Sequence, residues 1–305
     1  MTKNYDILFN FYKDYKFLKT CLANINKQSI LAKKLIFTDD GNNNFNLKRF
    51  IRKNLNKKIK LIYIRNKKNL GPEKCTESAT RYISSKFFYN QSADDLHFSD
   101  FAKYSIEALG KYPKAPYVFS NLLINNLNNK KNYKLKYFFL KKNYFNKEEI
   151  KKILKNKQFK IYHNTVMFNS KIYLKDNIQK KKYGPRSDML NLYYLASKYG
   201  FVYINKDLSA FTFRKNQYGK ILSDTSLIKE LLFLKNKKIK FYKFLSDCNL
   251  HFDISIFSIK KLYDNKLQDL VSISWFLRSI KFWIWKKIRF FVPAKILQVA
   301  FKFFS

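Results

Sequence analysis

Residues 35–41 read Leu-Ile-Phe-Thr-Asp-Asp-Gly, a short apolar run that ends in two carboxylates and a glycine. A run of this kind is typical of a buried strand that ends in a turn, where glycine permits a backbone conformation that other residues avoid. Similar strand-like runs occur at Tyr5–Phe9, Lys60–Ile64 and Phe87–Tyr89. We therefore expect four strands in the first third of the chain.

Helical patterns separate these strands. Tyr15–Lys27 has apolar residues at helical spacing, Asn46–Leu55 can form a second helix, and Pro72 can open a third that runs to about Ser85. Strands that alternate with helices favour an α/β fold, with a mostly parallel sheet flanked by helices on both faces. In such sheets, ligands bind beyond the carboxyl ends of the strands.

The second half of the chain is less regular. Lys130–Lys157 is rich in lysine and asparagine, and we interpret it as an insertion or a helix-loop element over the sheet edge. Helical spacing over Arg186–Tyr199 is closed by Gly200 as a C-cap. Strand-like patterns occur at Ile161–Phe168, Val202–Ile204 and Ala210–Phe213.

From about Ser223 the pattern becomes helical to the end of the chain. We therefore expect two parts, a main α/β domain over residues 1–220 and a helical C-terminal region over residues 221–305.

The strand ends carry the first candidate site residues. The segments Phe9–Tyr12, Asp39–Gly41 and Asp94–Asp95 each follow a predicted strand, so we expect them at one rim of the sheet. The Asp39 carboxylate can accept hydrogen bonds from a nucleobase or a ribose hydroxyl. By itself, however, Asp-Gly is also an ordinary turn.

Asp94 and Asp95 are candidates for holding Mg²⁺ or Mn²⁺ against a diphosphate, because hard oxygen ligands suit those ions. The competing interpretation is a helix N-cap pair ahead of Phe98–Leu109, where acidic residues are favourable with the helix dipole.

Two further residues occur later in the chain. Asp188, at the start of a predicted helix, can act as a general base toward an acceptor hydroxyl, or can simply cap that helix. Arg214 follows the predicted strand Ala210–Phe213, where a guanidinium can bind pyrophosphate through two hydrogen bonds. Because the chain has 62 Lys and Arg residues, a surface role is the competing interpretation for Arg214.

Taken together, these segments resemble the family 2 glycosyltransferases, which have the GT-A fold, over roughly residues 5–220. The resemblance is carried by Tyr12–Leu18, Cys21–Ile25, Gln28-Ser29, Ile36–Gly41, Asn69–Pro72 and Ser92–Asp95. The later segments Gly184–Asp188, Tyr199-Gly200 and Phe213-Arg214 look like the acceptor-side half of that family.

The resemblance implies a role for each candidate. Asp39 would contact the nucleotide base or ribose, with Phe11 and Tyr12 beside the base. Asp94 and Asp95 would contact ribose and the Mn²⁺ or Mg²⁺ ion. Asp188 would be the catalytic base, and Arg214 would lie near the donor phosphates.

The chain departs from the family pattern at three places. The glycine-serine that often follows the Asp-Asp pair is Gly41-Asn42 here. Ser92 stands where many members have the first aspartate of an Asp-x-Asp-Asp element, which leaves open whether Asp94 or Asp95 binds the metal. The usual acidic pair at the base position is Ser187-Asp188 here, so Asp188 alone can serve.

The formal net charge of +41 favours anionic partners such as nucleic acid, phospholipid or phosphorylated substrates. Bias in genome composition toward lysine and asparagine is an alternative cause of this charge. A nucleic-acid-binding protein is the alternative function, because phosphate contacts and stacking platforms need basic and aromatic residues. No recognition-helix or single-strand-binding motif supports it, however, and we expect no nucleic-acid partner.

The C-terminal segment suggests a membrane surface. The three tryptophans, Trp275, Trp283 and Trp285, are interleaved with basic residues, and the segment after Pro293 is amphipathic. Such a segment favours peripheral binding to an anionic membrane, at the cytoplasmic face of a bacterial cell membrane, although a helix that closes the core is the competing interpretation. A non-catalytic membrane scaffold is the third hypothesis for the whole protein.

Other features limit the alternatives. The three cysteines and three histidines are scattered, so neither a disulfide framework nor a thiolate or histidine metal cluster is expected. We expect neither a signal peptide nor a membrane span. The resemblance implies a nucleotide-sugar donor and a glycan or lipid-linked acceptor, in the synthesis of a bacterial surface polysaccharide.

Overall fold

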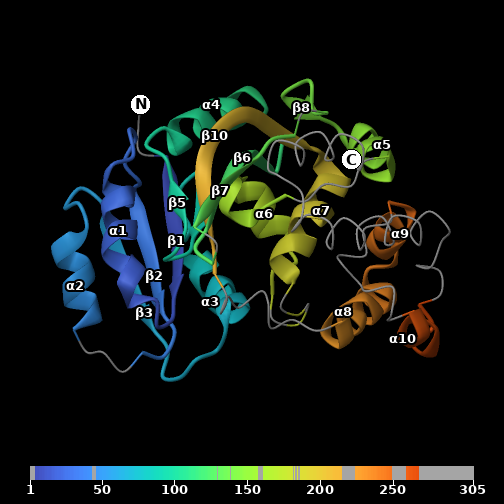
Figure 1. The fold of residues 1–305 in the computed structure, drawn as a ribbon, viewed down its shortest axis with the longest axis horizontal. Coiled ribbons are helices and arrows are strands. Elements are labelled where there is room, and N and C mark those ends of the chain that lie inside the picture. Colours follow the sequence, from blue (N-terminus) through green and yellow to red (C-terminus); the bar gives the residue numbers. More distant parts are fainter. Residues whose placement is uncertain are drawn as a thin grey trace. The chain divides into compact units, whose positions relative to one another are not determined.

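A central sheet organises the larger part of the chain, as a computed structural model shows (Figure 1). The structure describes residues 4–42, 46–128, 130–137, 139–156, 161–180, 182, 184, 186–214, 224–248 and 259–267. The strands are β1 (Tyr5–Phe11), β2 (Lys34–Asp39), β3 (Lys60–Arg65), β4 (Phe87–Gln91), β5 (Leu96–His97), β6 (Tyr117–Asn126), β7 (Lys131–Leu135), β8 (Tyr144–Phe145), β9 (Val166–Asn169) and β10 (Phe201–Phe213). Among the described residues the strand order is β3-β2-β1-β4-β9-β6-β10-β5, with β7 on β6 and β8 on β10.

Helices accompany these strands in chain order. They are α1 (Tyr15–Asn26), α2 (Leu47–Asn54), α3 (Pro72–Ala79), α4 (Phe101–Lys111), α5 (Lys147–Asn156), α6 (Ser170–Asp176), α7 (Ser187–Tyr199), α8 (Asp224–Lys237), α9 (Ile239–Asp247) and α10 (Ile259–Asp264), with short 3₁₀ turns η1 (Thr80–Tyr82) and η2 (His163–Thr165). The mixed α/β fold with a mostly parallel sheet, expected from the sequence, is confirmed.

Parallel pairing brings the ends of the first strands to one rim. Strands β3, β2, β1 and β4 are all parallel, and the register sets Phe11 beside Asp39 and Asp39 beside Arg65. Strand β9 is antiparallel to both β4 and β6, so its beginning lies at the rim where β4 ends. The candidate residues at these chain positions therefore lie along one edge of the sheet.

Alternation along the strands produces two buried faces. Phe9 and Phe37 pack together with ring centroids 4.9 Å apart, in an apolar cluster that also holds buried residues of α1, α2 and α4. The next residues along these strands, Leu8 and Ile36, are also buried but lie outside that cluster. Helix α3 packs against β1 and β2, and Tyr173 of α6 packs against Phe88 of β4. Helices therefore flank both faces of the sheet.

Several element boundaries differ from the sequence prediction. Val202–Ile204 and Ala210–Phe213 belong to the single strand β10, because pairing with β6 continues through two register shifts between Ile204 and Ser209. The polar stretch between these runs interrupts the apolar pattern without interrupting the backbone pairing. The predicted strand Ile161–Phe168 is reduced to β9, preceded by the turn η2.

The lysine-rich segment Lys130–Lys157 is partly a continuation of the sheet. Its first part forms β7, which pairs antiparallel with β6, and its middle forms β8, which pairs with β10. Its last part forms the helix α5. The helix-loop interpretation rested on the polar composition of this segment. Backbone hydrogen bonding to β6 and β10 determined its structure instead.

Two helices differ from their predicted bounds. Helix α3 ends at Ala79 and continues as a 3₁₀ turn to Tyr82, short of the expected end near Ser85. Helix α4 begins at Phe101, later than the expected start at Phe98. The pair Asp94-Asp95 therefore precedes the short strand β5 rather than a helix, and the N-cap interpretation of that pair is wrong.

The chain divides into two compact units. The first comprises residues 1–147 and 161–220, and the second comprises residues 148–160 and 221–305. Within the second unit, apolar side chains of α8 and α9, such as Leu231, Leu234 and Leu245, are buried. An ion pair of 2.8 Å joins Lys151 and Asp247 in the same unit. Among the described residues, no helix is long and apolar enough to cross a membrane.

Gly200 provides a test of the fold at the end of α7. Its φ of +86° is a conformation that L-residues rarely adopt, and an added Cβ would lie 2.2 Å from the carbonyl oxygen of Phe145. The substitution Gly200→Ala is expected to lower the free energy of unfolding by at least about 2 kcal/mol, measured by urea denaturation.

The matched control is Gly110→Ala in the last turn of α4. An added Cβ there meets nothing within 4 Å, and the residue is helical. Alanine should therefore raise the free energy of unfolding by about 0.5–1 kcal/mol. Equal destabilisation by both substitutions would contradict the conformation assigned to Gly200.

Candidate functional site

The first carboxylate of the rim, Asp39, is fully buried at the end of β2. Its Oδ1 accepts two hydrogen bonds from Asn42, one from the backbone N–H at 3.0 Å and one from the side-chain amide at 2.7 Å. The hydroxyl of Tyr63 donates to Oδ2 at 2.7 Å, and Nε of Arg65 lies 3.9 Å from the same oxygen. Asp39 is thus held in one orientation by several hydrogen-bond donors.

The charge of Asp39 affects the pKa of two neighbouring tyrosines, Tyr63 and Tyr15. Burial, reinforced by the hydrogen bond to Asp39, raises the pKa of the Tyr63 hydroxyl. Burial and the charge of Asp39 also raise the pKa of Tyr15, which packs edge-on against Phe11. Both hydroxyl groups therefore remain protonated near neutral pH, and the hydrogen of Tyr63 is donated to Asp39.

Asp40 organises the loop that leads into α3. Its Oδ1 accepts from the backbone N–H of Leu70 and the amide of Asn66, each at 2.8 Å, and its Oδ2 accepts from the N–H of Gly71 at 3.0 Å. Gly41 lies against the same loop, since an added Cβ would be 2.4 Å from the carbonyl carbon of Lys68. Asp40 therefore joins the end of β2 to the start of α3, a role that sequence reasoning missed.

The aromatic residues after β1 differ in exposure. Phe11 is buried and packs against Phe37, with ring centroids 5.6 Å apart. Tyr12 is 40% exposed, so it is the ring of the two that offers a free surface at the rim. The amide of Asn10 donates to the hydroxyl of Thr76 at 2.7 Å, which ties this strand end to α3.

Arg214 joins three segments at the same edge of the sheet. Its Nε donates to Oδ2 of Asp94 at 2.9 Å, and its Nη2 donates to Oδ2 of Asp14 at 2.8 Å. The guanidinium also lies over the ring of Phe17, 5.3 Å from the centroid. The end of β10, the turn after β4 and the beginning of α1 are therefore connected through one side chain.

Asp95 differs from its neighbour. It is 4% exposed, and its Oδ1 accepts from the backbone N–H of Thr212 at 3.3 Å. Burial, and then the charge of Asp94, hold the pKa of Asp95 well above its usual range. Asp94 is the member of the pair that contacts Arg214, whereas Asp95 faces the backbone of β10.

A divalent cation at Asp94 and Asp95 would need further ligands from its substrate. In the part of the chain that the structure describes, no group of three or more His, Cys, Asp or Glu side chains could hold a metal by itself. Mg²⁺ commonly uses one or two carboxylates together with substrate phosphates and water. Here Asp94 is paired with Arg214 and Asp95 accepts from the backbone of β10, so a cation would take the place of Arg214 at Asp94 and complete its coordination with phosphate oxygens and water.

Asp188 lies in the first turn of α7, half-buried, with its Oδ1 accepting from the N–H of Met189 at 2.6 Å. Its charge affects the pKa of two side chains, the half-buried His163 and the buried Tyr173. Burial lowers the pKa of His163, while Asp188 acts in the opposite direction. Burial raises the pKa of Tyr173, and Asp188 adds to that effect.

The two residues on which Asp188 acts belong to a polar cluster. The hydroxyl of Tyr173 donates to Oε1 of Gln179 at 2.9 Å, and Gln179 also forms a hydrogen bond with His163. Nε2 of His163 lies 3.3 Å from the amide nitrogen of Asn90, on the strand that leads to Asp94. Sequence reasoning missed these partners because each is an isolated polar residue with no motif around it.

The geometry is thus a sheet edge with two acidic centres. One comprises Asp39 with its buried donors, and the other comprises Asp94 and Asp95 with Arg214. Asp188 lies on a helix whose first turn borders the end of β4 through His163 and Asn90. Such an arrangement can bind a polar, phosphorylated ligand and present a carboxylate to a second substrate.

Comparison with known proteins places these features in a family. The model of the family described as "Glycosyl transferase family 2" matches residues 6–173 of the chain. The match includes Asp39, Asp94 and Asp95 but ends before Asp188 and Arg214. No curated protein sequence matches the chain.

Solved structures share the fold at low sequence identity. The structure of S. aureus TarS 1-349 in complex with UDP-GlcNAc has a TM-score of 0.62 and 13% identity, over 88% of this chain and 82% of that one. The same protein in complex with UDP has a TM-score of 0.61 and 13% identity, over 88% and 80%. A longer TarS structure has a TM-score of 0.59 and 14% identity, over 85% of this chain and 45% of that one.

The role of Asp40 can be tested by Asp40→Asn. The substitution puts an amide where a carboxylate now accepts from three donors, so it should lower the free energy of unfolding by about 1.5–3 kcal/mol. Urea denaturation measures the effect. Asp100→Asn, at an N-cap without a side-chain cap bond, is the matched control and should change stability by less than about 0.5 kcal/mol. Equal effects would show that Asp40 does not anchor the loop.

Proposed function

Since the chain belongs to glycosyl transferase family 2 and is a glycosyltransferase, we propose that it transfers a sugar from a nucleoside-diphosphate sugar to a hydroxyl of a glycan or lipid-linked acceptor, with inversion at the anomeric carbon. One observation carries the proposal. The acidic groups of Asp39 and Asp94 and the guanidinium of Arg214 lie along one edge of the sheet, inside a fold shared with UDP-sugar complexes.

Asp39 and Tyr12 make up the nucleotide end of the proposed site. A carboxylate that is already oriented by Asn42 and Tyr63 can accept a further hydrogen bond from a ribose hydroxyl or a nucleobase without a large loss of side-chain entropy. The exposed ring of Tyr12 provides a surface on which a base can stack. Asp40 contributes indirectly, because it holds the neighbouring loop in place.

Arg214 and the acidic pair make up the phosphate end. In the proposal, Asp94 and Asp95 hold Mn²⁺ or Mg²⁺, which when bound supplies positive charge to the departing diphosphate. Arg214 is kept near the phosphates by Asp14 and by the ring of Phe17, even when it releases Asp94. Its guanidinium can then donate two hydrogen bonds to phosphate oxygens.

Asp188 is the proposed general base. It would accept the proton of the acceptor hydroxyl while the oxygen of that hydroxyl bonds to the anomeric carbon. The bond from the anomeric carbon to the diphosphate breaks in the same displacement, and its electron pair leaves with the nucleotide. A single displacement from the opposite side inverts the configuration of the sugar. The charge of this carboxylate acts on His163 and Tyr173, and Gln179 forms hydrogen bonds with both of these residues.

The cellular role that we propose is inferred from the family alone. A transferase of this kind at the cytoplasmic face of a bacterial membrane would build surface polysaccharide, and the basic, tryptophan-rich segment from Ser274 onward would bind the anionic surface. That segment lies outside the described residues. Sedimentation with anionic liposomes, before and after truncation at Val271, measures its contribution.

A thermal-shift screen of nucleotide sugars tests the donor class. We expect a selective rise in the melting temperature with one nucleotide sugar, larger with Mn²⁺ than without, because a ligand that binds only the folded state stabilises it. The substitution Asp94→Asn should remove the metal-dependent part of the shift. An absence of any shift across all nucleotide sugars and both metals would contradict the proposed activity.

The substitution Asp188→Asn tests the base. Removal of a positioned general base should lower kcat by about 10²–10⁴-fold, while the affinity for the donor stays within about threefold. Asp264→Asn, which changes an exposed acid of α10, is the matched control and should leave kcat unchanged. Transfer at the full rate by Asp188→Asn would assign the base to another group.

A further inference from the structure

Asn42 is buried just after β2, and its backbone and side-chain polar groups are all hydrogen-bonded. Its side-chain amide donates to Oδ1 of Asp39 at 2.7 Å and to the carbonyl oxygen of Phe11 at 3.3 Å. Its own carbonyl oxygen accepts from Nη2 of Arg65 at 3.3 Å. The ends of β1, β2 and β3 are therefore joined through this one residue.

The side-chain oxygen of Asn42 holds a strained residue. It accepts from the backbone N–H of Lys13 at 3.1 Å. Lys13 has a φ of +60°, in the left-handed region that residues with a Cβ rarely adopt. Such a conformation persists only where the surrounding structure holds it. The bond to Asn42 can do so, because it fixes the N–H of the strained residue itself.

Lys13 lies between two residues of the proposed site. Tyr12 precedes it, and Nζ of Lys13 is 4.9 Å from the centroid of the Tyr12 ring. Asp14 follows it and accepts from Nη2 of Arg214 at 2.8 Å. Because the φ of Lys13 sets the direction of the chain after β1, it fixes where Tyr12 lies relative to Asp14. The proposed nucleotide end and the proposed phosphate end are thus linked through one backbone angle.

The connection depends on asparagine rather than on the serine that often follows the glycine in the family pattern. The backbone N–H of residue 42 donates to Asp39 at 3.0 Å, and serine could keep that bond. A hydroxyl, however, lies one bond closer to the backbone and has one hydrogen to donate, whereas the amide has two. Serine therefore cannot replace the side-chain bonds to Asp39 and Phe11 and also reach Lys13.

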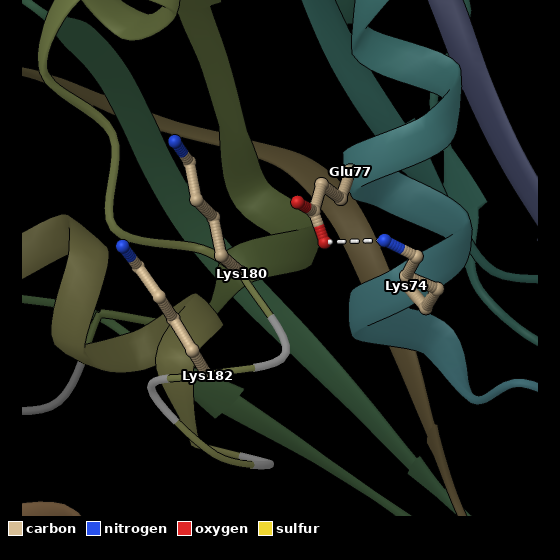
Figure 2. A pocket seen from close by; sticks show the side chains of 4 residues that line it. All are labelled: Lys74, Glu77, Lys180 and Lys182. Carbon is tan, nitrogen blue, oxygen red and sulfur yellow. Dashed lines mark hydrogen bonds and ion pairs between the residues drawn. The ribbon is translucent and has the colours of Figure 1, made fainter.

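The hydrogen bonds of Asn42 are separate from the charged cavity beside α3. That cavity of about 470 Å³ is lined by Lys74 and Glu77 of α3 and by Lys180 and Lys182 (Figure 2). An ion pair of 3.2 Å joins Lys74 and Glu77. In the described part of the chain, every hydrogen bond of Asn42 goes to other residues, so a substitution at Asn42 should leave this cavity intact.

We propose that Asn42 is a positioning residue of the donor site, because it holds Lys13 in the left-handed conformation. Tyr12 and Asp14 are thereby kept at the separation that one nucleoside diphosphate requires. The inference rests on the proposed function, since it concerns the same donor. Asn42 acts through Lys13 and makes no contact of its own with the donor. A site that is arranged before binding lowers the entropic cost of association.

Hydrogen exchange of the full chain tests the contact between Asn42 and Lys13 without any ligand. Asn42→Ser should speed exchange of the Lys13 amide at least about fivefold, because that N–H loses its acceptor. Mass spectrometry with residue resolution measures the rate. An unchanged exchange rate of Lys13 in this variant would overturn the inference.

Asn26→Ser is the matched control. The side chain of Asn26 also donates and accepts, to the carbonyl oxygen of Asn54 at 2.7 Å and from the N–H of Asn56 at 2.8 Å. It is, however, the last residue of α1, at the other end of that helix from Lys13. Its substitution should lower the melting temperature by a similar amount and leave the exchange of the Lys13 amide unchanged.

Titration with nucleoside diphosphates tests the consequence for the donor. UDP, GDP, CDP, ADP and dTDP are each titrated into the full chain with Mn²⁺, and the tightest binder is used for the variants. Asn42→Ser should raise its Kd about 3–10-fold. The KM for the corresponding nucleotide sugar should rise by a similar factor, while kcat stays within about threefold. Asn26→Ser should change the Kd by less than about 1.5-fold.

A second substitution separates positioning from general destabilisation. Lys13→Gly, added to Asn42→Ser, should recover at least about half of the lost affinity on a logarithmic scale, because glycine adopts a positive φ without the acceptor. A defect elsewhere in the fold would not be repaired by a change at Lys13. Absence of this recovery, or equal weakening by Asn26→Ser, would overturn the inference.

Failure of the proposed function gives a different pattern. If none of the five nucleoside diphosphates binds the unsubstituted chain, the donor role of the site fails, and the role of Asn42 toward the donor fails with it. The exchange of the Lys13 amide would still show whether Asn42 holds the loop. Binding to the unsubstituted chain with no change in Asn42→Ser would overturn the inference alone.

Discussion

The adjacent carboxylates Asp39 and Asp40, at the end of β2, are the constraint on which the rest of the site depends. The first turns toward Tyr63 and Asn42, and the second turns toward Leu70 and Gly71. Both side chains are buried, so each needs its hydrogen bonds to offset the loss of hydration. One residue thereby shapes the proposed nucleotide end, while the next fixes the loop from which α3 begins.

Several of the few acidic residues of the chain form specific hydrogen bonds or ion pairs. Among 62 basic residues and 21 acidic ones, Asp14 and Asp94 both pair with Arg214, and Asp6 accepts from Ser84 and Ser85 near the start of β4. Because a carboxylate inside this strongly positive chain interacts favourably with many cations, its position depends on specific donors rather than on net attraction. The site is therefore defined by the geometry of these hydrogen bonds.

The sequence by itself determined the order of strands and helices through Tyr89 and the acidic residues at the strand ends, because apolar periodicity and turn residues are local signals. It also determined the family, through segments whose order and spacing are read along the chain. It did not reveal the continuity of β10 or the strand β7, since backbone pairing with β6 is independent of the polar side chains there.

The tertiary structure alone decided the partners. Asp40 accepts a hydrogen bond from Gly71, and Arg214 donates one to Asp14, although these partners are far apart along the chain. Gln179 forms hydrogen bonds with His163 and Tyr173. The tertiary structure also decided that Phe11 is buried while Tyr12 remains exposed. A hydrogen bond depends on distance and direction in space, and no local pattern of residues encodes which distant donor a buried carboxylate will find.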